Sequence, residues 1–381
     1  MLERTKPPFR ADQVGSLIRP PSLVAARQAA GRGEITAAEL RRIQEEAICG
    51  VVRMQEDVGL RPITDGEYNR QAWHRDFLLR FDNVKLVPSK IRVRFHSADG
   101  TRDQAPPSWQ VTGKLKRPAP IFVEDFRFLA AVTRGMPKIT IPSPTVMHFR
   151  GGRDAIDSHA YPDMAEFYAD LARVYAEEID DLGQAGCRYL QIDEVNFAYL
   201  CDPALRAEVA NIGEDADLLP RIYAKLLNDT IARRPEDMTV CMHLCRGNYA
   251  GAWVAEGGYD PVAELLFNEI NVDGYFLEYD SARRKLRAAA LPAQGKDRGA
   301  GPRNDQKQRA RIQGRAETPH RRSITLRADR AARDQPAMRV RERHRRQHDD
   351  GRAADGEAAA DRGDGRGDLG NGVGRESRRA E

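Results

Sequence analysis

The sequence predicts an α/β protein built on a (β/α)8 TIM barrel. Helical and strand-like segments alternate from about residue 37 to residue 278, which is typical of a parallel sheet covered by helices. Polar side chains follow nearly every strand-like segment, and in a barrel all strand ends meet on one face. A doubly wound sheet, the alternative at this length, would spread such side chains more widely, so we expect the barrel.

The expected elements follow from residue spacing and end signals. Residues 37–59 have apolar side chains at helical spacing, and Thr36 before them is a suitable N-cap. Further helices are expected at 164–182, 218–232 and 261–269, and strands at 62–65, 138–142, 188–193, 238–244 and 272–277.

The last hundred residues differ in composition from the rest. Residues 1–280 contain 34 Lys+Arg and 42 Asp+Glu, whereas residues 281–381 contain 27 and 15, with 24 Arg and no aromatic residue. Such a segment cannot bury enough apolar surface to offset the entropy of ordering the chain. We therefore predict two regions, a barrel at 1–283 and a disordered tail at 284–381.

Cysteine number and hydropathy indicate the class of protein. The five cysteines have no framework spacing, which argues against a disulfide-stabilised secreted domain. The N-terminus has no apolar run typical of a signal peptide, and no stretch approaches the ~20 apolar residues that span a membrane. We expect a cytoplasmic protein.

A metal-binding chemistry is indicated by His243 and Cys245. They end a predicted strand, where side chains two residues apart project the same way, and both are zinc ligands by type. Glu278 ends the next strand and would be their neighbour in a barrel. The alternative is a buried His and Cys that only pack in the core.

Carboxylates follow two other strands. Asp193 and Glu194 are suited to binding a cation or an amine, although one could cap the following helix while the other is solvated. Glu67, after Gly66, has the same ambiguity.

Two further segments near the N-terminus have two possible interpretations each. Gly15 and Ser16 form either a turn that contacts substrate or the end of a first strand. Trp73 and His74 are expected to be a packed aromatic beside a surface imidazole.

Taken in order, these motifs resemble the catalytic domain of the cobalamin-independent methionine synthase family, and more closely its single-barrel bacterial relatives. The resemblance covers roughly residues 8–283 and rests on V-G-S-L-I-R-P at 14–20, T-D-G-E at 64–67, Q-I-D-E at 191–194, H-L-C-R-G-N at 243–248 and L-E-Y-D at 277–280.

The resemblance implies a zinc-dependent transfer of a methyl group from a methylated folate, or a similar donor, to a thiol such as homocysteine. It implies that His243, Cys245 and Glu278 bind Zn²⁺. Gly15, Ser16, Glu67 and Asp193 match positions that hold the amino acid part of homocysteine, with Glu67 and Asp193 as catalytic carboxylates that pair with its ammonium group. Zinc coordination would deprotonate the substrate thiol.

The chain departs from the family where a fourth ligand is expected, because no cysteine follows Cys245. Read from the second base of each codon, residues 335–341 permit S-P-Q-C-G-F-A, the kind of segment that supplies this cysteine. The same shift over residues 285–292 permits N-F-E-P-L-R-F-L. We infer a one-base frame offset near Arg283 or Arg284.

An offset there removes the last strand–helix unit of the barrel, so we expect the chain as written to be impaired. Two other functions were considered. A barrel enzyme of the uroporphyrinogen decarboxylase type would need no zinc. A nucleic-acid binder would use the basic tail, but the offset explains that composition without such a role.

Overall fold

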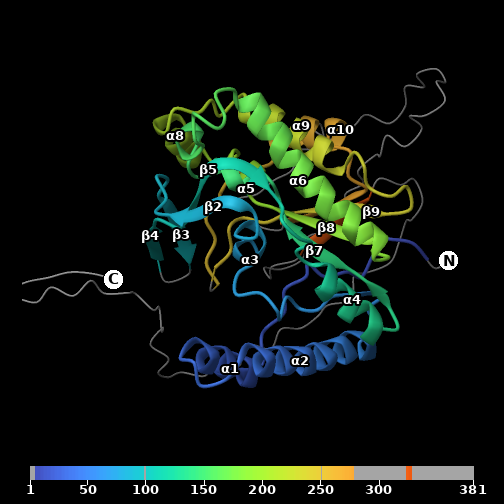
Figure 1. The fold of residues 1–381 in the computed structure, drawn as a ribbon. Coiled ribbons are helices and arrows are strands. Elements are labelled where there is room, and N and C mark those ends of the chain that lie inside the picture. The colour runs from blue at the N-terminus through green and yellow to red at the C-terminus, as the bar shows by residue number, and fades with distance from the viewer. Residues whose placement is uncertain (1–4, 98–99, 250, 279–322, 328–381) are drawn as a thin grey trace, which may run out of the picture. The chain divides into compact units, whose positions relative to one another are not determined.

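The computed structural model describes residues 5–97, 100–249, 251–278 and 323–327, all within one compact unit, Met1–Ala337 (Figure 1). Its first two helices are α1 (Pro21–Gly31) and α2 (Ala37–Asp57). Thr36 and Glu39 form a reciprocal capping box at the start of α2, as the N-cap prediction requires. Leu23 of α1 and Ile48 of α2 share a buried cluster with residues around the first strand.

The central sheet is parallel in the part that carries the predicted site. Its strands lie in the order in which they occur along the chain, without the reversal that defines a doubly wound sheet. Its parallel strands are β7 (Ile139–Pro142), β8 (Tyr189–Glu194), β9 (Thr239–Leu244) and β10 (Gly274–Glu278). A separate two-stranded parallel sheet consists of β1 (Pro62–Ile63) and β6 (Met136–Pro137), and β6 lies just before β7 in the chain.

Helices cover one face of this sheet (Figure 1). The longest are α6 (Met164–Gln184), α9 (Leu219–Ile231) and α10 (Asp260–Glu269), and α9 contacts both of the others. Between them and the strands lies the main apolar core. The shorter helices are α3 (Arg75–Leu78), α4 (Val123–Val132), α5 (Val146–Phe149), the 3-10 helix η1 (Arg153–Ala155), α7 (Asn196–Tyr199) and α8 (Pro203–Asn211).

Each helix and strand predicted between residues 37 and 277 is therefore present, with small shifts at the ends. No strand forms around Val14, where the first one was considered. Side chains rather than a neighbouring strand bind this backbone: Gln191 Nε2 donates to Val14 O at 2.7 Å, and Lys138 Nζ donates to Gln13 O at 2.6 Å.

Two antiparallel pairs between β1 and β6 were not predicted. β2 (Asp82–Val87) pairs with β5 (Ser108–Lys116), and β3 (Val93–Ser97) pairs with β4 (Gly100–Gln104). His96 of β3 also exchanges backbone hydrogen bonds with Trp253, at 2.7 and 3.0 Å, in the loop after β9. The segment that contains β2 to β5 thus contacts the loop that follows His243 and Cys245.

One segment of the predicted tail differs from the expectation. β11 (Ser323–Arg327) pairs antiparallel with β10, at the edge where a parallel strand would continue a barrel. Ile and Thr favour extended structure, and the open edge of β10 presents unpaired backbone groups. The boundary at 283 and the remainder of the tail lie outside the described residues.

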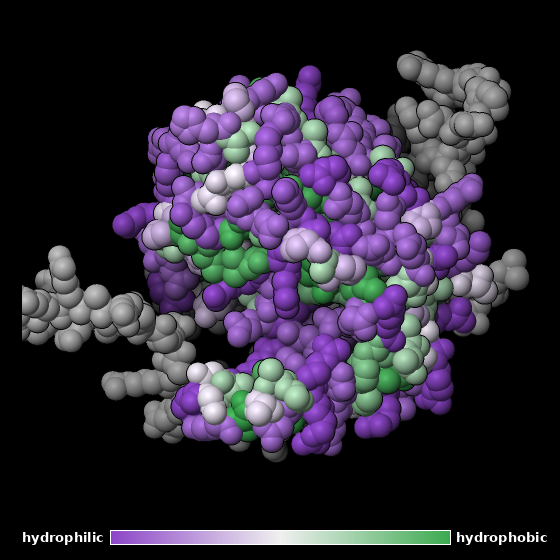
Figure 2. Space-filling view, in the orientation of Figure 1, coloured by the Kyte–Doolittle hydropathy of each residue, from purple (hydrophilic) through white to green (hydrophobic). Residues whose placement is uncertain are grey.

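The surface view in Figure 2 shows a mainly hydrophilic face in which hydrophobic residues occur in small groups. Among the described residues, no helix combines the length and the apolar composition that crossing a membrane requires.

Candidate active site

The two faces of the parallel sheet differ in chemistry. In the strand register Asp193 lies opposite His243, and His243 lies opposite Phe276, so these residues share one face. The alternate positions, such as Ile192, Leu244 and Leu277, are buried in the main core under the helices. Polar residues therefore gather on the face away from the helices.

Glu67 and Gly15 meet at this polar face. Thr140 Oγ1 of β7 donates to Glu67 Oε1 at 3.0 Å. A Cβ atom added to Gly15, whose φ is +118°, would lie 2.6 Å from Thr140 Cγ2 and 3.1 Å from Glu67 Oε1. Only glycine fits between these two side chains, so Gly15 lies directly against Glu67.

Arg70 belongs to the same cluster and was not predicted. It is buried, donates to Thr140 Oγ1 at 2.9 Å and to Thr140 O at 2.8 Å, and lies 3.8 Å from Glu67 Oε1. One positive charge is thus placed next to the buried carboxylates. Its position three residues after Glu67 does not by itself distinguish it from a solvated surface arginine.

The negative charge of Glu67 affects the ionisation of Asp193. Desolvation, and then the charge of Glu67, raises the pKa of Asp193 to about 8. Gln191 Nε2 donates to Asp193 Oδ1 at 2.6 Å and partly opposes this rise. Two carboxylates that repel each other in this way favour a bound cation, because a positive charge relieves the repulsion.

The neighbouring Glu194 has a structural role. Thr145 Oγ1 donates to Glu194 Oε2 at 2.7 Å, and the backbone N–H groups of Asn196 and Phe197 donate to Oε1 at the start of α7. The alternative reading, in which one carboxylate of the pair caps a helix, is confirmed for Glu194. The other carboxylate, Asp193, is half-buried and accepts a hydrogen bond from Gln191.

His243, Cys245 and Glu278 lie at the ends of β9 and β10. His243 Nδ1 is 3.0 Å from Phe276 O, so this nitrogen donates and Nε2 carries the lone pair. Burial lowers the pKa of His243 to about 4, which keeps the imidazole neutral. Desolvation and the nearby Glu278 carboxylate raise the pKa of the Cys245 thiol to about 12.

These three residues are not a preformed metal site in this structure. Within the described part of the chain, no three His, Cys, Asp or Glu side chains are grouped closely enough to hold a metal ion. Glu278 is the last described residue before 323, and its Oε1 accepts a hydrogen bond from Asn248 at 2.5 Å.

Two residues singled out in the sequence remain, Ser16 and His74. Ser16 is exposed, whereas Gly15 beside it is buried. His74 is not the surface imidazole that was expected: its ring stacks on Trp73 at 4.6 Å, contacts Trp109 edge-on at 5.5 Å, and is buried. Burial, and then the charges of Arg150 and Arg75, lower the pKa of His74 to about 3, so its imidazole is neutral.

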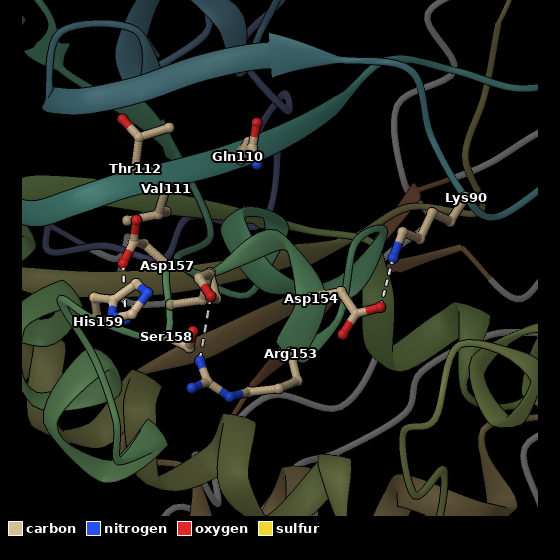
Figure 3. Close-up of a pocket in the computed structure, with 10 residues that line it drawn as sticks. Lys90, Gln110, Val111, Thr112, Arg153, Asp154, Asp157, Ser158 and His159 are labelled. Carbon is tan, nitrogen blue, oxygen red and sulfur yellow. Dashed lines mark hydrogen bonds and ion pairs between the residues drawn. The ribbon is translucent and has the colours of Figure 1, made fainter.

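A polar surface pocket lies apart from this site (Figure 3). None of the predicted site residues lines it. Its cationic side chains already have partners: Lys90 pairs with Asp154 at 2.7 Å, and Arg153 donates to Tyr161 O at 2.8 Å. The candidate active site is therefore the polar face of the sheet.

Comparison with known proteins identifies the family of the chain. The family model described as the catalytic domain of cobalamin-independent synthase matches residues 9–252. An uncharacterized protein of Bacillus subtilis (strain 168), YxjH, is 42% identical over 282 residues, which are 74% of this chain and 73% of YxjH.

More distant relatives carry functional names. The 5-methyltetrahydropteroyltriglutamate–homocysteine methyltransferase of Bradyrhizobium diazoefficiens is 30% identical over 189 residues, which are 49% of this chain and 23% of that protein. A solved structure from Listeria monocytogenes, assigned as a vitamin-B12-independent methionine synthase, has a TM-score of 0.58 and 36% identity, covering 74% of this chain and 80% of its own. The chain belongs to the cobalamin-independent methionine synthase family, which it matches through the catalytic domain.

Proposed function

We propose that this chain derives from an enzyme that transfers a methyl group from a methylated folate, or a similar donor, to the thiol of homocysteine, giving methionine. The observation that carries the proposal is the meeting of Gly15, Glu67 and Asp193 on the polar face of the sheet. Family membership and the names of the methyltransferase relatives support it.

The carboxylates would bind the amino group of the substrate. Glu67 and Asp193 carry two potential negative charges, and Arg70 carries one positive charge beside Glu67. An ammonium group would complete the charge balance and form charge-assisted hydrogen bonds with both carboxylates. The uroporphyrinogen decarboxylase alternative has no specific observation in its favour.

Zinc is the cofactor that the proposal implies, and the donor types fit it. His243 donates Nδ1 to a backbone carbonyl, the arrangement that fixes an imidazole with Nε2 free for a metal. Bound zinc would supply a substrate thiolate at neutral pH. Without a cation, burial and then the Glu278 carboxylate raise the pKa of the Cys245 thiol, and a bound cation would oppose this rise.

We further infer that the parallel sheet is part of a (β/α)8 barrel. The strands follow chain order without reversal, and polar side chains are found where several of them end. With a frame offset near Arg283, the last strand–helix unit and the fourth ligand would be missing. The enzyme would then be impaired in the chain as written, because three ligands leave the thiol site incompletely charged and walled.

Small molecules are the partners that this function requires, and a cytoplasmic location is part of the proposal. The alternative function, nucleic-acid binding, would use the basic tail, most of which lies outside the described residues.

The proposal is tested by assaying methyl transfer to homocysteine with the chain and with Asp193→Asn, each in its written and its frame-restored form. Activity in the restored chain that Asp193→Asn abolishes is the expected result. If the frame-restored chain keeps its activity when Asp193 is replaced by Asn, the assigned site is refuted.

A further inference from the structure

Gln191 makes two hydrogen bonds with one amide group. It lies two residues before Asp193 on β8, so both side chains project from the same, polar face of the sheet. Its Nε2 donates to the backbone oxygen of Val14 at 2.7 Å and to Asp193 Oδ1 at 2.6 Å. One side chain thus joins the segment that carries Gly15 to one of the two carboxylates proposed to bind substrate.

The orientation of this amide follows from its two partners. A carbonyl oxygen and a carboxylate oxygen both accept hydrogen bonds, so only the NH₂ end of Gln191 can serve them. The side chain is fully buried, and its Oε1 has no hydrogen-bond partner in the described part of the chain. An unpaired buried acceptor costs free energy that an apolar side chain of similar size would avoid. Stability alone therefore does not account for a glutamine at this position.

The backbone oxygen that accepts from this amide is held in place on both sides. Lys138 Nζ donates to Gln13 O at 2.6 Å, and Thr64 Oγ1 donates to Gly15 O at 2.8 Å. Val14 O lies between these two carbonyls in the chain. The amide therefore connects a fixed point to the carboxylate, and it limits the positions that the carboxylate can take.

We propose that Gln191 is a positioning residue, which holds the Asp193 carboxylate and the Gly15 segment in the relative arrangement that binds the amino group of the substrate. This inference rests on the proposed function. Asp193 is half-buried and would contact the ammonium group, whereas Gln191 would act through Asp193. A carboxylate that is already held in one orientation loses less conformational entropy when its ligand binds.

The test measures binding of homocysteine and of its desamino analogue to the full-length chain by isothermal titration calorimetry, so no catalytic activity is required. The two ligands share the thiol and the carboxylate, and the ratio of their affinities therefore reports the ammonium site. Gln191→Met removes both donated hydrogen bonds at similar volume, and Gln191→Asn keeps the amide but is one methylene shorter. Gln55→Met is the matched control, because Gln55 is also buried and its Nε2 also donates to two backbone oxygens, those of Val51 at 3.0 Å and Thr64 at 2.8 Å.

We expect both Gln191 variants to lower the affinity ratio by about tenfold, the lower end of what a hydrogen bond to a charged group contributes. Gln55→Met should leave the ratio unchanged, even where urea unfolding shows an equal loss of stability. Asp193→Ala should itself abolish the preference for homocysteine, and adding Gln191→Met to it should change the ratio no further, because the two residues act as a unit.

The outcomes separate this inference from the proposed function. If Asp193→Ala abolishes the preference while the Gln191 variants keep the parent's ratio, or if Gln55→Met lowers the ratio as much as they do, the positioning role is overturned and the ammonium site stands. If the parent binds both ligands equally, or neither, the ammonium site and the positioning role are overturned together.

Discussion

Substituting Gly15 by alanine tests the contact between the N-terminal segment and the carboxylate cluster. Gly15 has a φ of +118°, and an added Cβ would lie 2.6 Å from Thr140 Cγ2 and 3.1 Å from Glu67 Oε1. Backbone strain of this kind costs roughly 1–3 kcal/mol. Overpacking a closed site costs roughly 1–3 kcal/mol more. The sum is about 2–6 kcal/mol, a large share of the stability of an ordinary domain.

Gly100 provides a control that separates the two costs. Its φ is +124°, close to that of Gly15, but an added Cβ would have no atom within 4 Å. In Gly100→Ala the free energy of unfolding should therefore fall by the cost of backbone strain alone. Urea unfolding of both variants measures the difference, which we expect to be about 1–3 kcal/mol. Equal losses in the two variants would show that Gly15 is not wedged between Thr140 and Glu67.

Two further predictions concern the carboxylates. In the frame-restored chain, Glu67→Gln should raise the KM for homocysteine by about 10- to 150-fold, because it removes a charged hydrogen bond worth roughly 1.5–3 kcal/mol. The KM for a thiol that lacks the amino group should not change, and an equal rise for both thiols in steady-state kinetics would count against an ammonium site. Asp193→Asn should make the substrate-free protein more stable at alkaline pH. The pKa of Asp193 is raised to about 8 in the fold, above its unfolded value, so its contribution to stability falls as pH rises through this range. Urea midpoints measured from pH 5 to pH 9 should decline less for the variant than for the parent, and parallel declines would contradict the assignment.

The sequence was sufficient for elements whose signals are local. Thr36 and Glu39 specify the start of α2 through a capping box that can be recognised three residues apart. The apolar runs of β8 and β9 are buried strands, as expected, and their ends place Asp193 opposite His243. Chemistry at strand ends was predictable because parallel strands bring their ends to one edge.

Features that depend on distant contacts were not predictable. The pair β2–β5 joins residues far apart in the chain, and β4, G-T-R-D-Q, has no apolar alternation to mark it as a strand. The burial of His74 depends on Trp109, which lies on β5. Arg70 gave no separate signal, since an arginine near a glutamate more often forms a solvated pair.

We propose that this chain derives from a methyl-transferring synthase and that a frame offset near Arg283 impairs it. The most direct measurement compares homocysteine methylation by the chain as written with methylation by a chain in which one base restores the frame near Arg283. The account predicts activity in the restored chain and little or none in the written one. Equal activity in both, or none in the restored chain, would contradict it.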